Sequence, residues 1–216
     1  MIITRRAFTA ALSLTGLAAL AGLSQFRFIT DAFADLAADV AKPQPLPDMA
    51  LGPADAAVTI VEYASLTCPH CAAFNKNVFP QIKAAYIDTG KIRYVLREYP
   101  LNEPALAGSK LARCIAKDDA AKYFALSDLL FKQDWYNGDT KDTLYRVGRQ
   151  AGLSKPQVDK CIGDEAVQDK IMAGRKYAAD VLKVEATPTF FINGEKFQGE
   201  ASFEEFDKRI KALLKS

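Results

Sequence analysis

Apolar residues first run together at residues 58–64, "VTIVEYA", which are β-branched and apolar enough for a buried strand. After this run the pattern changes, and apolar residues recur at every fourth position. This spacing predicts a helix with one apolar face, formed by Phe74, Val78, Ile82 and Tyr86.

The limits of this helix are also marked in the sequence. Pro69 suits the first helical turn, where its missing N–H is not needed, and Gly90 ends the pattern. Pro80 should kink the helix. Residues 91–99, "KIRYVLREY", form the next predicted strand, and two strands joined through a helix pair in parallel.

Residues 102–183 show helical spacing almost throughout, interrupted by short breaks. Gly152 is suited to a C-cap, and Ser154 with Gln157 has the spacing of a capping box. We expect an all-helical segment here, inserted between the parallel strands and the end of the chain.

The pattern after this helical block is that of a β-hairpin. Asn193-Gly194 separates two short aromatic and β-branched runs in "TFFINGEKFQG", which is the strongest short-range hairpin signal. A last helix should begin at Ser202, with Glu205 completing a capping box. The hairpin adds antiparallel strands to the parallel pair.

The N-terminus has a different character. Residues 1–34 carry paired arginines followed by an apolar run too short for a comfortable membrane span, and Ala32-Phe33-Ala34 offers a small-x-small cleavage pattern. We interpret this segment as an export signal, cleaved after about Ala34 or retained as a membrane anchor. Its Thr4-Arg5-Arg6-Ala7-Phe8 resembles a twin-arginine signal. Residues 35–56 are proline-rich and should be an extended lead-in.

Charge excludes some partners. The chain of 216 residues has a net charge of +2 and no Lys/Arg run of the kind that binds nucleic acid. Without residues 1–34, which hold three Arg and one Asp, 25 basic residues balance 25 acidic ones. Partners must then be found by shape and apolar contact.

The candidate chemistry lies in Cys68-Pro69-His70-Cys71, directly after the first strand. A closed zinc site needs four ligands, and the other two cysteines, Cys114 and Cys161, form no second Cys-x-x-Cys pair. A bond between cysteines three positions apart closes too small a loop to stabilise the fold much. A soft metal such as Cu(I) on the lone pair stays possible.

A redox function gives each residue of this motif a role. Cys68 would stand at the N-cap of the helix that begins at Pro69, where the helix dipole and unpaired N–H groups stabilise a thiolate. His70 can add positive charge or a hydrogen bond, and Cys71, one turn further, is placed as the resolving thiol. Stabilising the reduced form makes the disulfide a stronger oxidant.

Three segments in this order, "VEYASLTCPHCAAF", "REYPL" and "VEATPTFFINGEKFQG", resemble the DsbA family of thioredoxin-fold oxidoreductases. The resemblance covers about residues 50–216. It implies an α/β thioredoxin fold with a mixed parallel and antiparallel sheet. We expect the thioredoxin-like domain at residues 57–101 and 184–216, with the helical insertion at 102–183.

The resemblance also implies roles for single residues. Cys68 is similar to the family's nucleophile and Cys71 to its buried partner. Pro188 resembles the cis-proline that faces the active site, and Thr187 before it would offer backbone groups to an extended substrate strand. Glu62 matches a buried acid that the family uses as a proton relay beneath the dithiol.

Two further expectations concern contacts between side chains of this chain: the partner of the Glu62 carboxylate, and a second disulfide. No clear lysine is present to pair with the Glu62 carboxylate, so Arg93 or Arg97 is the expected partner. Cys114 and Cys161 resemble a second disulfide that some DsbA-like proteins carry on the helical insertion.

These features predict a monomeric periplasmic thiol:disulfide oxidoreductase that donates the Cys68–Cys71 disulfide to newly exported proteins. It would need no metal or bound cofactor, and a membrane quinone reductase of the DsbB type would reoxidise it. Two alternatives stay open: an isomerase or reductase on the same fold, and a periplasmic protein that only sequesters copper.

Overall fold

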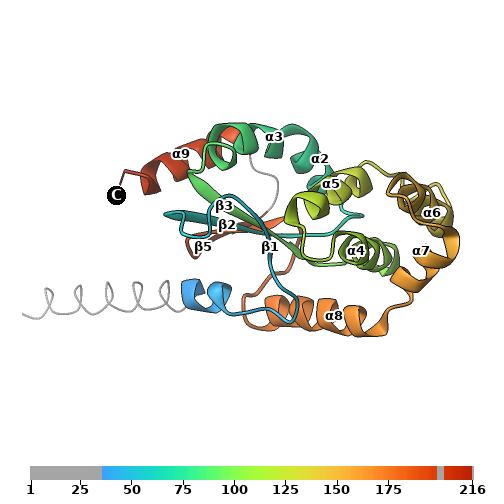
Figure 1. Ribbon diagram of the computed structural model, residues 1–216. Helices are drawn as coiled ribbons and strands as arrows, with labels where there is room; N and C mark the ends of the chain where they lie inside the picture. The colour runs from blue at the N-terminus through green and yellow to red at the C-terminus, as the bar shows by residue number, and fades with distance from the viewer. Residues whose placement is uncertain (1–35, 199–201, 216) are drawn as a thin grey trace, which may run out of the picture.

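The computed structural model describes residues 36–198 and 202–215. A single five-stranded sheet, in the order β1-β3-β2-β4-β5, lies at its centre (Figure 1). β2 and β3 are parallel and the other neighbouring pairs are antiparallel, which confirms the predicted mixed sheet. The strands are β1 (Met49–Leu51), β2 (Val58–Ala64), β3 (Ile92–Glu98), β4 (Thr189–Ile192) and β5 (Glu195–Gln198).

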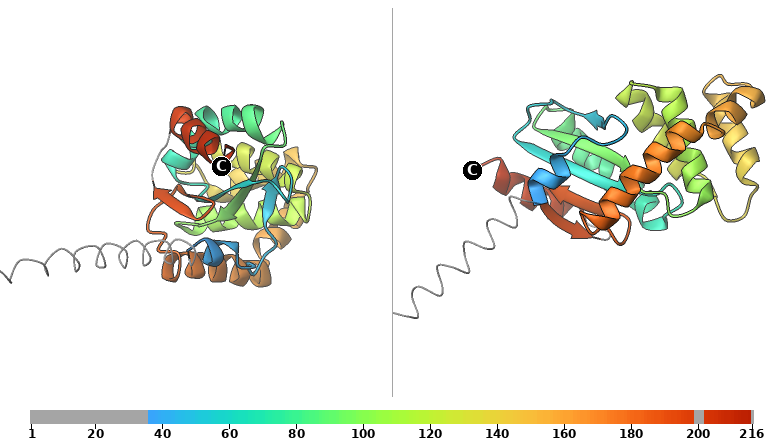
Figure 2. Two further views of the ribbon diagram at one scale, coloured as in Figure 1. Left: turned by 90° about the vertical axis from the view of Figure 1, so that its left-hand side faces the viewer. Right: turned by 90° about the horizontal axis from the view of Figure 1, so that it is seen from below.

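Helices cover both faces of this sheet (Figures 1 and 2). One face carries α2 (Pro69–Asn77), α3 (Phe79–Ile82), the π-helical turn η1 (Lys83–Ile87) and α9 (Phe203–Leu213), and the other carries α8 (Glu165–Asp180). Four more helices gather beyond one end of the sheet: α4 (Glu103–Ala116), α5 (Ala120–Phe131), α6 (Thr140–Gln150) and α7 (Lys155–Ile162).

Each face of the sheet has its own apolar core, because side chains alternate along a strand. On the α2 face, the rings of Phe74 and Phe190 lie 4.6 Å apart, and those of Phe190 and Phe206 lie 5.0 Å apart. The next residue along β4, Phe191, belongs to the second core, beneath α8. Full burial of each such ring contributes about 1.5–3 kcal/mol, so these aromatic residues fix α2 and α9 over the sheet.

Local signals place most of the element boundaries as predicted. Asn193 and Gly194 have φ of 46° and 90°, the positive values that the hairpin turn between β4 and β5 requires. The Ser202 hydroxyl accepts from the backbone N–H of Glu205 at 3.3 Å and caps α9. Both features are read from a few neighbouring residues, which is why the sequence reveals them.

The expectation of an extended lead-in at residues 35–56 is partly wrong. Residues 36–41 are helical, because the prolines begin only at position 43 and Val40 buries its side chain in the second core. β1 then pairs with β3, so the sheet begins at Met49 rather than at residue 57. The export signal expected in residues 1–34 lies outside the described residues. Within 36–198 and 202–215, no helix has the length and apolarity needed to cross a bilayer.

The helix expected from Pro69 to Gly90 is broken rather than kinked. α2 ends at Asn77, and Pro80 stands in the first turn of the short α3, where its missing N–H costs no hydrogen bond. The wider η1 turn follows before Gly90, whose φ of 69° ends the segment.

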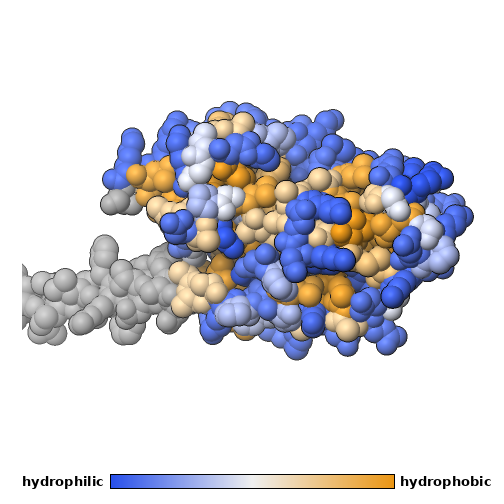
Figure 3. Space-filling model, viewed as in Figure 1, coloured by the Kyte–Doolittle hydropathy of each residue, from blue (hydrophilic) through white to orange (hydrophobic). Residues whose placement is uncertain are grey.

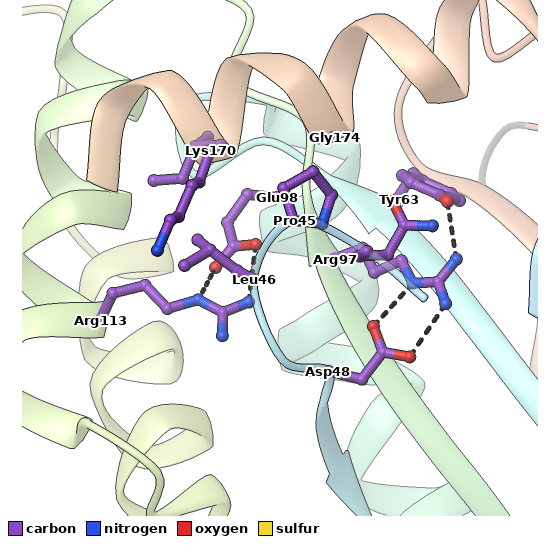
Figure 4. Close-up of a pocket in the computed structure, with 11 residues that line it drawn as sticks. Pro45, Leu46, Asp48, Tyr63, Arg97, Glu98, Arg113, Lys170 and Gly174 are labelled. Carbon is purple, nitrogen blue, oxygen red and sulfur yellow. Dashed lines mark hydrogen bonds and ion pairs between the residues drawn. The ribbon is translucent and has the colours of Figure 1, made fainter. Parts of the chain in front are cut away.

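Two ion pairs on β3 border a small cavity of about 20 Å³, and the pair of Arg113 and Glu98 is the more deeply buried of the two (Figure 4). Arg97 donates to both carboxylate oxygens of Asp48, at 2.8 and 2.9 Å, and to the hydroxyl of Tyr63 at 2.8 Å. The guanidinium of Arg113 forms two hydrogen bonds with the Glu98 carboxylate. These pairs hold two parts of the chain against the sheet: α4, and residues 42–48 before β1, which we call the N-terminal strap.

The face of the molecule seen in Figure 3 has hydrophobic residues across its middle and hydrophilic residues around its rim. A groove of about 570 Å³ lies between α3, α5 and β1, and its lining includes Leu51, Phe79 and Phe124. Neither Cys68 nor Cys71 lines this groove.

Candidate active site

Cys68 and Cys71 lie at the start of α2, where the chain leaves β2. Cys68 is the N-cap residue with an extended backbone, and Pro69 follows in the first helical turn. The Cys71 side chain is fully buried and Cys68 is 5% exposed, whereas Pro69 and His70 are exposed. Both cysteines are free thiols, so the structure shows the reduced form of the pair.

The surroundings of Cys68 favour its thiolate. The pKa of Cys68 is lowered from 9.0 to about 5, and the largest cause is a hydrogen bond from the Cys71 thiol. The Thr187 side chain and hydrogen bonds from the backbone N–H groups of Cys71 and His70 lower this pKa further, against the opposing effect of burial. Such N–H groups have no partner within the first turn of a helix. Cys68 is therefore ionised at neutral pH.

Cys71 behaves in the opposite way. Burial raises the pKa of Cys71 far above its ordinary value, and the hydrogen bond to Cys68 and the charge of Glu62 raise it further. The Cys71 thiol therefore keeps its proton at neutral pH. One reactive thiolate next to one buried thiol is the arrangement that thiol–disulfide exchange needs.

The Thr187–Pro188 peptide bond is cis, and it lies directly beside Cys68. The Cys68 thiol donates to the carbonyl oxygen of Thr187 at 3.2 Å. The buried Thr187 hydroxyl has no hydrogen-bond partner within the described part of the chain. The Thr187 side chain nevertheless contributes to the lowered pKa of Cys68, so this hydroxyl is available to the thiolate without being bonded to another group of the described chain.

Glu62 of β2 points to the same face of the sheet as the dithiol, and its side chain is almost completely buried. Burial raises the pKa of Glu62 to about 7, and the charge of Cys68 adds to this effect. The Tyr94 hydroxyl donates to Glu62 Oε2 at 2.6 Å and lowers the pKa. The expected partner, Arg93 or Arg97, was therefore wrong: both belong to the other face of the sheet, where Arg97 is bonded to Asp48 and Tyr63.

Comparison with known proteins agrees with this geometry. The sequence model of a family described as thioredoxin matches residues 45–212. The crystal structure of alpha-DsbA1 from Wolbachia pipientis superposes with a TM-score of 0.73 at 34% sequence identity, covering 80% of this chain and 94% of that one. The chain belongs to the DsbA family.

Two curated relatives differ from this chain in length or in sequence. A Rickettsia bellii protein provisionally named a protein-disulfide oxidoreductase is 36% identical over 150 residues, which cover 68% of this chain and 57% of that protein. The chain thus spans little more than half the length of that relative. Disulfide bond formation protein D of Bacillus subtilis is 26% identical over 175 residues, 76% of each chain.

The other two cysteines of this DsbA-family chain form a disulfide within the helical group. Cys114 of α4 and Cys161 of α7 have Sγ atoms 2.02 Å apart and Cα atoms 5.5 Å apart. Among the described residues, no cluster of three or more His, Cys, Asp or Glu side chains could hold a metal ion.

Tyr94 is the site residue that sequence reasoning missed. The parallel register pairs Ile60 of β2 with Tyr94 of β3, so Tyr94 and Glu62 point to one face of adjacent strands. A signal for it existed: two predicted parallel strands, with Glu62 as the polar side chain of the first and Tyr94 and Glu98 as those of the second on the face of the dithiol. The register that brings Tyr94 to Glu62 depends on how the helical crossover between the strands packs, which the sequence does not show.

Proposed function

We propose that this DsbA-family protein donates the Cys68–Cys71 disulfide to newly exported proteins in the periplasm. The observation that supports this best is the pair of opposed pKa shifts, lowered to about 5 for Cys68 and raised for Cys71. The oxidised protein has no thiol to ionise at either position. Whatever stabilises the Cys68 thiolate therefore stabilises the reduced protein alone, which makes the disulfide a stronger oxidant.

In the first step, a substrate thiolate attacks Cys68 Sγ of the oxidised protein. A bond forms between the substrate sulfur and Cys68 while the Cys68–Cys71 bond breaks, and Cys71 leaves with the electron pair. Its sulfur takes up a proton, because the pKa of Cys71 lies far above neutral. Glu62, whose pKa is about 7, is the buried acid that relays this proton.

In the second step, the other thiolate of the substrate attacks the substrate sulfur of the mixed disulfide. The substrate disulfide forms, and Cys68 leaves as the more stable thiolate. Two electrons have then passed from the substrate to the protein, one proton has stayed on Cys71, and one proton has gone to solvent. A membrane quinone reductase of the DsbB type would remove the two electrons and restore the disulfide.

The Cys114–Cys161 disulfide supports export to an oxidising compartment. Structural disulfides persist in the periplasm and are rare in the cytosol. We expect fractionated cells to hold the protein in the periplasm, either free or anchored by residues 1–34. Recovery of the protein from the cytosol with Cys114 and Cys161 reduced would contradict this placement.

The direction of electron flow separates an oxidase from the reductase or isomerase alternative. We expect a reduction potential above about −180 mV at pH 7, on a scale where thioredoxin lies near −270 mV and DsbA near −120 mV. Equilibration of the purified protein with glutathione measures this potential. A value near that of thioredoxin would assign the protein to the reductases.

The pH dependence of the same equilibrium tests its cause. Between the pKa of Cys68, about 5, and that of glutathione, about 8.5, reduction of the protein consumes one proton fewer than reduction of glutathione disulfide. The equilibrium constant for reduction of the protein by glutathione should therefore rise about tenfold for each pH unit in this range. An equilibrium constant independent of pH would show that both cysteines carry protons.

Oxidation of a reduced, unfolded protein with two cysteines tests the activity itself. The oxidised protein should form the substrate disulfide in a single turnover, and Cys68→Ser should abolish the reaction. Met172→Ser, on the exposed surface of α8, is the matched control and should keep the wild-type rate. Retention of single-turnover activity by Cys68→Ser would contradict the proposed function.

A further inference from the structure

Two large hydrophobic side chains remain exposed on segments that are hydrogen-bonded to the residues just before Cys68. Among the described residues, Tyr136 is 70% exposed and Leu101 is 49% exposed, and both belong to connecting segments outside helices and strands. Each is attached by a hydrogen bond to residues 65–67, the three residues that precede Cys68. Exposed apolar groups gathered at one place commonly mark a binding surface.

The attachments join three segments that are distant in the sequence. The Tyr136 hydroxyl donates to the carbonyl oxygen of Thr67 at 2.6 Å, and the backbone N–H of Leu101 donates to the Ser65 hydroxyl at 3.3 Å. The Thr67 hydroxyl in turn donates to Asn102 Oδ1 at 3.1 Å. The connections β3–α4 and α5–α6 therefore flank the segment that carries the nucleophile.

The backbone around Tyr136 is held in place from within its own loop. Asp134 Oδ1 accepts from the backbone N–H groups of Tyr136 and Asn137, at 3.0 and 3.1 Å. Trp135, 8% exposed, donates through its indole N–H to the Leu130 carbonyl at 3.1 Å and anchors the loop in the core.

Gly108 permits this anchoring, because a Cβ there would lie 3.2 Å from the Trp135 ring and 2.9 Å from Leu66 Cδ1. Trp135 and Leu66, which stands two positions before Cys68, thus both pack against Gly108 of α4. The Tyr136 ring is then fixed at its backbone and at its hydroxyl, while its faces are open to solvent. A rigid aromatic ring of this kind offers contact area at a small cost in side-chain entropy.

We propose that Tyr136 and Leu101 contact the residues beside the reacting cysteine of the substrate, and that Tyr136 is a specificity-determining residue that favours apolar side chains there. This inference rests on the proposed function. The occupant is an extended segment of an unfolded exported protein.

The geometry of the mixed disulfide leads to this assignment. A substrate sulfur bonded to Cys68 lies about 2 Å from Cys68 Sγ, and each further residue of an extended chain advances about 3.3 Å. Residues on one side of the substrate cysteine therefore come within reach of the segments attached to residues 65–67, which directly precede Cys68. Residues 35–216 carry no net charge, which leaves apolar contact as the means of recognition.

Two peptides with two cysteines each, identical except for Leu or Ser on both sides of the first cysteine, test the proposal. The oxidised wild-type protein should oxidise the Leu peptide about fivefold faster, the scale expected for removing part of a leucine side chain from water. Tyr136→Ser should bring the ratio of the two rate constants close to one, mainly by slowing the Leu peptide. Tyr136→Phe keeps the ring and should keep the ratio.

Two further variants complete the design. Leu101→Ser should lower the ratio as Tyr136→Ser does, and it gives a second test if Tyr136→Ser does not fold. Met172→Ser removes an exposed hydrophobic side chain of α8 and should leave the ratio unchanged.

The ratio separates recognition from a structural role. If Tyr136 only supports the Thr67 carbonyl, Tyr136→Ser slows both peptides equally, the ratio stays near five, and the inference is overturned. A wild-type ratio of one overturns it as well. In both cases the peptides are still oxidised, so disulfide donation stands; failure to oxidise either peptide would instead count against the proposed function.

Discussion

Glu62 is an acidic residue of β2, and the side chains next to it in this strand are all buried. Its carboxylate accepts a hydrogen bond from Tyr94, whose ring is completely buried on the same face of the sheet. Burial raises the pKa of Glu62 and the Tyr94 hydroxyl opposes this effect, so the value of about 7 is a balance of the two.

Tyr94→Phe should raise the pKa of Glu62 above 7, because it removes the hydroxyl that donates to the Glu62 carboxylate and keeps the ring that fills the space. Infrared absorption of the protonated carboxyl, followed against pH, measures the shift. At pH 7 about half of the Glu62 side chains are protonated in the wild type, and most should be protonated in the variant.

Tyr123→Phe is the matched control for this measurement. Tyr123 is also a buried tyrosine, and it donates to the Glu98 carboxylate at 2.6 Å. Its replacement should leave the titration of Glu62 unchanged. An unshifted Glu62 midpoint in Tyr94→Phe would show that the hydroxyl does not set this pKa.

At the scale of elements, the buried pair of Arg113 and Glu98 joins the helical group to the sheet. Glu98 ends β3, and Arg113 lies in the last turn of α4, with both side chains less than a tenth exposed. Arg113 also donates to the Pro47 carbonyl at 2.7 Å, so one side chain connects the N-terminal strap, α4 and β3.

Arg113→Met should lower the free energy of unfolding by about 3–5 kcal/mol, because it leaves the Glu98 carboxylate buried without its cation. Unfolding in urea measures the loss. The double variant Arg113→Met/Glu98→Leu should recover most of the stability, since it removes both charges. Lys176→Ala, which breaks an exposed pair with Asp180, should change little. Equal losses in the single and double variants would contradict this account.

Elements with signals in their own residues could be predicted, and those made by distant contacts could not. Pro69 and the apolar run before it locate the N-terminus of α2 and hence Cys68, and Asn193-Gly194 locates the hairpin. β1 has three residues between prolines and becomes a strand only by pairing with β3, more than 40 positions away. For the same reason, the contacts of Glu62 with Tyr94 and of Thr67 with Tyr136 emerged only from the structure.

At the scale of the whole molecule, the two cysteine pairs are separate in place and in role. The Cys114–Cys161 bond closes a loop of 47 positions within the helical group, whereas Cys68 and Cys71 belong to α2 over the sheet. The first restrains the unfolded chain, and the second is the pair that we propose exchanges its bond with other proteins.

Replacing Cys114 and Cys161 together by Ala should therefore lower the free energy of unfolding by about 4 kcal/mol, the loop entropy expected for this separation. The reduction potential of the Cys68–Cys71 pair should stay the same. Urea unfolding and the glutathione equilibrium measure the two quantities on one preparation. A change in potential of about 30 mV or more, tenfold in the equilibrium constant, would show that the pairs are coupled.

The proposed function depends on Cys68 ionising alone, well below neutral pH, while Cys71 keeps its proton. Titration of the ultraviolet thiolate absorbance, on protein whose Cys68–Cys71 pair has been reduced and whose second disulfide is intact, tests it most directly. We expect one thiolate per molecule, with a midpoint at about pH 5 and a constant signal between pH 6 and 8. Two thiolates appearing together near pH 9, as for ordinary cysteines, would contradict it.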